Sequence, residues 1–144
     1  FMNACQLVTR CGPLAGRVML ALKFLISGYA KIGDFTASAG YMASKGIPFA
    51  EIALVLAIII EIGGGAMLVA GCKARWAAFA IFLFLIPATL IFHNFWAVEA
   101  AQFQGQLNHF LKNVCIMGGM LYIIAYGSGP LSLDRCDCAE KGDS

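Results

Sequence analysis

The sequence predicts an all-α integral membrane protein, a four-helix bundle that runs up-down-up-down through the bilayer. Of its 144 residues, 60% are hydrophobic and only 12% are charged, which is about half the charged fraction of an average soluble domain. Four apolar stretches each have the length of about 20 residues that spans the hydrocarbon core. The connections between them are short, so consecutive spans are expected to be antiparallel neighbours.

The expected spans cover residues 12–32, 49–71, 75–95 and 108–126. Charged residues interrupt the first two of these spans, at Arg17, Lys23, Lys31 and Glu61. The third span is the most apolar and carries Pro87, which neighbouring helices can accommodate. No span alternates polar and apolar residues as a barrel strand does. The connection 34–48 is expected to hold a short interfacial helix at residues 38–45.

The chain is expected to form one domain, residues 12–133, between short tails at residues 1–11 and 134–144. Lysine and arginine are more frequent on the side of the two tails, so the positive-inside rule predicts that both tails are cytoplasmic. No short apolar segment with a cleavage site precedes the first span, so no cleaved signal peptide is expected. The net charge of +2 is scattered without a basic run, and no nucleic-acid partner is therefore expected.

Ionisable side chains at membrane depth are costly and often mark function. Lys23 lies near the middle of the first span and Glu61 near the middle of the second. Antiparallel neighbours bring their midpoints to one depth, so the sequence predicts a Lys23–Glu61 ion pair. Such a pair either fixes the helix register or acts as a proton relay.

A second polar cluster is expected at the end of the bundle away from the tails, built from Lys31, His93, Lys112 and Asn113. These side chains either form a ligand pocket or belong to the interfacial belt, where lysines extend toward water. Among the six cysteines, Cys5, Cys11, Cys136 and Cys138 fall on the tails. They either form a four-thiolate metal site or remain separate thiols, and the lack of a Cys-x-x-Cys pair favours separate thiols.

An ordered set of short motifs resembles the DoxX family of small bacterial membrane proteins. The motifs are Ser27–Lys31, Gly46–Pro48, Glu61–Gly64, Phe92–Phe95, Phe110–Asn113 and Gly127–Asp134. The resemblance covers residues 17–134 and implies a four-helix protein of the bacterial inner membrane. It also implies a role beside oxidoreductase subunits, because relatives include the membrane subunit of a thiosulfate:quinone oxidoreductase.

Three functions follow as hypotheses. The first is a membrane subunit of an oxidoreductase complex that binds quinone between its helices, with His93, Lys112, Asn113 and Lys31 around the ring and Glu61 as a proton carrier. Phenylalanines at positions 92, 95 and 110 would then wall the site. The second is an accessory or scaffold subunit that docks into a larger membrane complex. Both require membrane lipids and other membrane or redox subunits as partners; a proton or solute pathway along Lys23 and Glu61 is a third hypothesis.

Overall fold

A computed structural model describes residues 2–134 of the chain, and within them every regular element is helical. The elements are α1 (Ala4–Gly33), α2 (Phe35–Ser44), α3 (Ala50–Ile58), the π-helical turn η1 (Ile59–Gly63), α4 (Gly64–Ala70), α5 (Ala74–Phe92), the 3₁₀ turn η2 (Phe95–Ala97) and α6 (Ala100–Tyr126). The continuous segment α3–η1–α4 counts as one span, so the described part of the chain has four helices long and apolar enough to cross a membrane. The all-α four-span fold class is confirmed.

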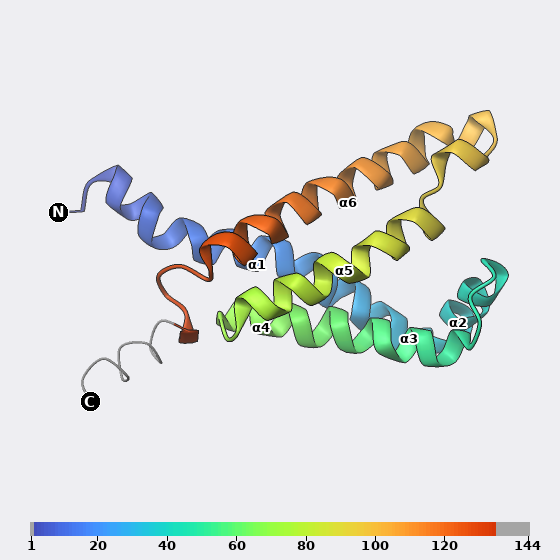
Figure 1. Cartoon of the computed structure of the whole chain (residues 1–144), viewed down its shortest axis with the longest axis horizontal. Helices are drawn as coiled ribbons and strands as arrows, with labels where there is room; N and C mark the ends of the chain where they lie inside the picture. The colour runs from blue at the N-terminus through green and yellow to red at the C-terminus, as the bar shows by residue number, and fades with distance from the viewer. Residues whose placement is uncertain (1, 135–144) are drawn as a thin grey trace.

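The spans run up and down in succession, so that α1 begins and α6 ends at the same end of the bundle (Figure 1). We call this the tail end, and the end that carries α2 and η2 the distal end. The short helix expected in the first connection is present as α2. Helix α1 starts well before the expected residue 12, because Asn3 and Gln6 form a capping box in which the backbone N–H of Asn3 donates to Gln6 Oε1 at 3.1 Å.

Glycines set how closely the central spans approach. A Cβ added at Gly64 would lie 3.0 Å from Ile81 Cδ1 of α5, and one added at Gly65 would lie 3.0 Å from Leu25 Cδ2 of α1. Both glycines are buried. The segment α4 is therefore the centre of the bundle, packed between α1 and α5, as small residues permit in membrane helices.

A buried arginine fixes the tail end. Arg17 of α1 is only 2% exposed, and its guanidinium donates to the carbonyls of Leu68 at 2.8 Å, Val69 at 3.2 Å and Leu131 at 2.8 Å. The first two carbonyls belong to the last turn of α4, where the helix dipole favours a cation. Arg17 thus ties α1 to α4 and holds the segment after α6 against both.

The last described residue, Asp134, caps a helix that begins 60 residues earlier. Its carboxylate accepts hydrogen bonds from the backbone N–H groups of Lys73 and Ala74, the latter at 3.0 Å, at the start of α5. Burial acts to raise the pKa of Asp134, but these hydrogen bonds and the charge of Arg17 outweigh it, so the pKa lies below its ordinary value. Asp134 is therefore an ionised cap of α5 at neutral pH.

Toward the distal end the bundle opens. Figure 1 shows α5 and α6 diverging from α1 and α3 as they approach the end that carries α2. Residues from both diverging pairs line one cavity, and this cavity contains most of the polar side chains at membrane depth.

Candidate functional site

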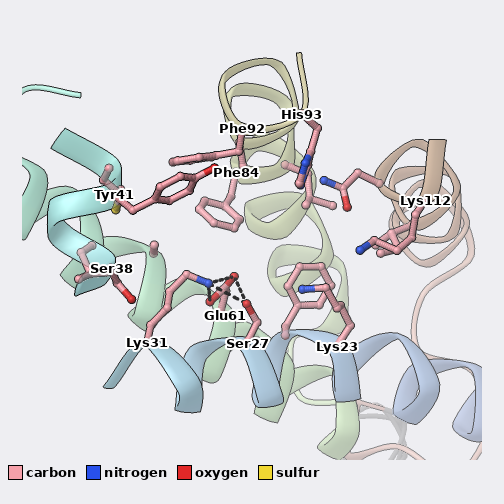
Figure 2. Close-up of a pocket in the computed structure, with 18 residues that line it drawn as sticks. Lys23, Ser27, Lys31, Ser38, Tyr41, Glu61, Phe84, Phe92, His93 and Lys112 are labelled. Atoms are coloured by element: carbon pink, nitrogen blue, oxygen red, sulfur yellow. Dashed lines mark hydrogen bonds and ion pairs between the residues drawn. The ribbon is translucent and has the colours of Figure 1, made fainter. Parts of the chain in front are cut away.

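Glu61 is the central acidic group of the site. It lies in the π-helical turn η1 and is 4% exposed. Lys31 Nζ donates to Glu61 Oε2 at 2.9 Å, to Glu61 Oε1 at 3.1 Å and to Ser27 Oγ at 2.7 Å, while the Ser27 hydroxyl donates to Glu61 Oε1 at 3.2 Å (Figure 2). Ser27 and Lys31 are four residues apart on α1 and therefore share one face. We call these three residues the Glu61 triad.

The predicted partner of Glu61 was wrong: the ion pair is Lys31–Glu61, not Lys23–Glu61. The prediction aligned the midpoints of the two spans. The actual register is set by close contacts, because an added Cβ at Gly28 would lie 2.6 Å from Ile62 Cγ1, which places Gly28 opposite η1. Lys23 lies more than one turn nearer the tail end, so Lys31 reaches the carboxylate instead.

A cavity of about 290 Å³ lies beside the triad. Its walls combine apolar and aromatic side chains with a few polar groups, the usual composition of a small-molecule site. Its aromatic wall comes from α1, α2 and α5, with Phe24, Tyr41, Phe84 and Phe92. The rings of Tyr41 and Phe92 stack at 5.5 Å between centroids, which joins α2 to α5 across the distal end (Figure 2).

Three lysines line this cavity together with one carboxylate. Lys31 is paired with Glu61, whereas Lys23 and Lys112 have no carboxylate within ion-pair distance among residues 2–134. Lys112 Nζ instead lies 3.4 Å from His109 Nδ1. Two cationic groups at membrane depth thus have no acidic partner in the described part of the chain.

His93 lines the cavity at the end of α5 and is held from α6. Its Nδ1 lies 3.0 Å from Gln106 Oε1, so the tautomer that makes this hydrogen bond carries its proton on Nδ1, because a carboxamide oxygen only accepts. The ring also stacks on His109 at 5.1 Å between centroids. Nε2 is consequently the nitrogen of His93 that is left to exchange a proton with a ligand.

Asn113 lines the same cavity but is also a structural link. It is 6% exposed, and its amide nitrogen donates to Thr89 Oγ1 at 3.0 Å, which ties α6 to α5. All four residues expected in the polar cluster line this one cavity: Lys31, His93, Lys112 and Asn113. Lys23, expected elsewhere, lines it as well.

The expected aromatic walls are only partly correct. Phe92 lines the cavity, but Phe95 and Phe110 do not belong to its lining. Their rings pack edge-to-face at 5.2 Å, and Phe95 also packs against Trp96 at 5.2 Å. These residues form a separate aromatic cluster that closes the turn between α5 and α6.

The expected four-thiolate site is incomplete in the described part of the chain. Cys5 and Cys11 are exposed free thiols on α1, whereas Cys136 and Cys138 lie outside the described residues. Cys11 follows Cys5 by six positions on the helix, which turns their side chains about 120° apart. No group of three or more potential metal ligands occurs among the residues described.

The sequence pattern alone did not identify several residues of the site. Ser27 is four residues from Lys31, a spacing that does place it on the same helix face. Tyr41 and Phe84 look like ordinary apolar positions, and Gln106 like a polar residue of a helix start. Their roles depend on contacts between elements that are far apart in the sequence.

The chain belongs to the DoxX family. The family model matches residues 12–94. The inner membrane protein YphA of Escherichia coli is 30% identical to the chain, over 85% of this chain and 87% of that protein. The inner membrane protein YqjF of the same organism is also 30% identical, over 86% of this chain and 90% of that protein. The Surfeit locus protein 4 homolog of Schizosaccharomyces pombe is 31% identical, over 85% of this chain but only 36% of that protein. No solved structure matches the chain.

With two relatives in the inner membrane of Escherichia coli and four candidate spans of its own, the chain is a multi-pass inner-membrane protein of the DoxX family.

Proposed function

We propose that this protein is the membrane subunit of a quinone-linked oxidoreductase and that its cavity binds the quinone ring. The observation that carries the proposal is the composition of the cavity wall. Flat side chains of Tyr41, Phe84 and Phe92 stand near cationic and imidazole groups of Lys23, Lys112 and His93. A quinone has the matching chemistry, a flat apolar ring with two carbonyl oxygens that accept hydrogen bonds.

The size of the cavity supports a ring rather than a whole lipid quinone. Its 290 Å³ is close to the lower limit of about 300 Å³ for small-molecule sites. An isoprenoid tail would extend from the cavity into the surrounding lipid. The divergence of the helices toward the distal end (Figure 1) leaves the cavity between two helix pairs, not inside a closed bundle.

Protons for quinone reduction have carriers in this proposal. Reduction of a quinone to a quinol takes up two electrons and two protons. One proton comes from the Lys31–Glu61 pair of the triad and the other from His93 Nε2 when the imidazole is protonated on both nitrogens, and a redox subunit that associates with this chain supplies both electrons. The π-helical turn at Glu61 agrees with such a role, because π-turns inside helices frequently occur at functional sites.

The test is quinone content and quinone turnover of the complex purified gently from its own membrane. We expect near one quinone per chain in the wild type and strongly reduced turnover in His93→Ala and Lys112→Ala, with assembly unchanged. Lys73→Met is the matched control, because Lys73 is an exposed lysine at the tail end. Wild-type quinone turnover in both cavity variants contradicts the proposal.

The alternative is a non-catalytic scaffold subunit, and two helix glycines with free space beside them favour it. An added Cβ would meet nothing within 4 Å at Gly16 of α1 or at Gly118 of α6. Glycines on a free face allow another membrane helix to approach closely. Loss of assembly in Gly16→Leu and Gly118→Leu, together with unaltered turnover in the His93 and Lys112 variants, would support the scaffold over the quinone site.

A further inference from the structure

The cavity has more positive than negative charge around it, and this imbalance specifies its ligand further. Its described lining contains three lysines and one carboxylate. Lys31 and Glu61 neutralise each other at 2.9 Å. Lys23 and Lys112 remain, and they reach the cavity wall from α1 and α6 (Figure 2).

Two unpaired ammonium groups at this depth are costly by themselves. Charged side chains within spans are generally paired with one another, with carbonyls or with a ligand. The described residues offer Lys23 no hydrogen-bond acceptor, and they offer Lys112 only an imidazole nitrogen at 3.4 Å. Arg17, on the same helix as Lys23, shows the contrast, because its two terminal guanidinium nitrogens donate to three carbonyls.

The other charged groups of the neighbouring elements do not restore neutrality. Asp34 and Glu51 lie near the distal end but are not among the residues of the cavity wall, and Lys45 of the same end places its Nζ 5.6 Å from the centre of the Tyr41 ring. His93 and His109 add donors or further positive charge. A negative charge that satisfies Lys23 and Lys112 therefore has to come with the ligand.

We propose that the cavity binds an acidic aromatic ligand, a ring that carries one negative charge at neutral pH, and that Lys23 and Lys112 select this charge. The inference rests on the proposed function only for the identity of the ring, because the proposed function makes that ring a quinone. Its preferred ligand is then an ionised hydroxyquinone over a neutral quinone of the same size. Charge-assisted hydrogen bonds from lysine to an anionic oxygen are about twice as strong as neutral ones, and the low dielectric of the membrane interior strengthens them.

The experiment measures ligand affinity of the purified full chain in detergent micelles, with three probes. The probes are 2-hydroxy-1,4-naphthoquinone, which is ionised at pH 7, the neutral 2-methyl-1,4-naphthoquinone, and 2-naphthoate, an acidic ring without quinone carbonyls. We expect the hydroxyquinone to bind more tightly than the methyl quinone by about tenfold, since one charge-assisted contact contributes about that factor. In Lys23→Met and Lys112→Met the ratio should fall toward one, whereas Lys73→Met should keep it.

The outcomes separate this inference from the proposed function. Equal affinity for the two quinones overturns the charge selection and leaves the quinone site standing. Binding of 2-naphthoate but of neither quinone overturns the proposed function and keeps the acidic-ligand site. A charge preference that persists in both cavity variants also overturns the inference, and a thermal unfolding curve for each variant shows that it is folded.

Discussion

The Lys31–Glu61 pair makes a sharp prediction, because Lys23 lines the same cavity and provides a control on the same helix. The pair has N–O distances of 2.9 and 3.1 Å, with Glu61 5% and Lys31 27% exposed in their side chains. Removing one partner of a buried pair costs about 3–5 kcal/mol. Because Lys31 keeps partial exposure, solvent screening reduces the cost below that range, and we expect Lys31→Met to lower the free energy of unfolding by about 2–3 kcal/mol.

The double-mutant cycle gives the decisive quantity, the coupling energy. Glu61→Gln removes the negative charge, so the variant with both Lys31→Met and Glu61→Gln should regain part of the loss and show a coupling of about 1–3 kcal/mol. The same cycle with Lys23→Met in place of Lys31→Met should show a smaller coupling, because Lys23 makes no ion pair with the carboxylate and only its charge acts on Glu61.

The assay is reversible unfolding of the purified protein in mixed micelles, followed by far-ultraviolet circular dichroism. Each variant is measured at several denaturant concentrations, and a common slope establishes that the same transition is compared. A larger coupling of Glu61 to Lys23 than to Lys31 would refute the register of α1 against η1, and with it the arrangement of the cavity wall.

Three further predictions concern the tail end and the α1–η1 contact. Arg17→Met should destabilise the protein by about 3 kcal/mol in the same unfolding assay, because one buried and two partly buried carbonyls lose their donor. A loss under about 1 kcal/mol would show that water replaces the guanidinium. The pKa of Asp134 is lowered in the folded state, so its contribution to the free energy of unfolding is fully present above the unfolded pKa of about 3.9 and is lost as the pH falls through the folded pKa. Asp134→Asn should therefore flatten the curve of stability against pH in that acid range. An unchanged curve would contradict the cap. Gly28→Ala should lower the melting temperature, because its Cβ would lie 2.6 Å from Ile62 Cγ1. A Cβ at Gly16 meets nothing within 4 Å, so Gly16→Ala should leave the melting temperature unchanged or raise it. Equal shifts in the two variants would contradict the close contact at Gly28.

Much of the architecture follows from the sequence by itself. Four long apolar segments in a chain this short leave most of their apolar surface outside the bundle, so a bilayer is the environment that suits them, and short connections leave one antiparallel order. The cluster around His93 and Lys112 was also predictable, because the ends of consecutive antiparallel spans have to meet. The third span ends and the fourth begins at the distal end, which brings those residues together whatever the details of packing.

Only the tertiary structure decided which charges pair. Ion pairing between two helices depends on their axial register and rotation, and an error of one or two turns exchanges one lysine for another. Here Gly28, Gly65 and Arg17 fix the register through close backbone contact and carbonyl hydrogen bonds, and none of these contacts has a local sequence pattern. Lys31 is consequently neutralised by Glu61, while Lys23 faces the cavity without a carboxylate among the described residues, which is the physical origin of the positive charge that we assign to ligand selection.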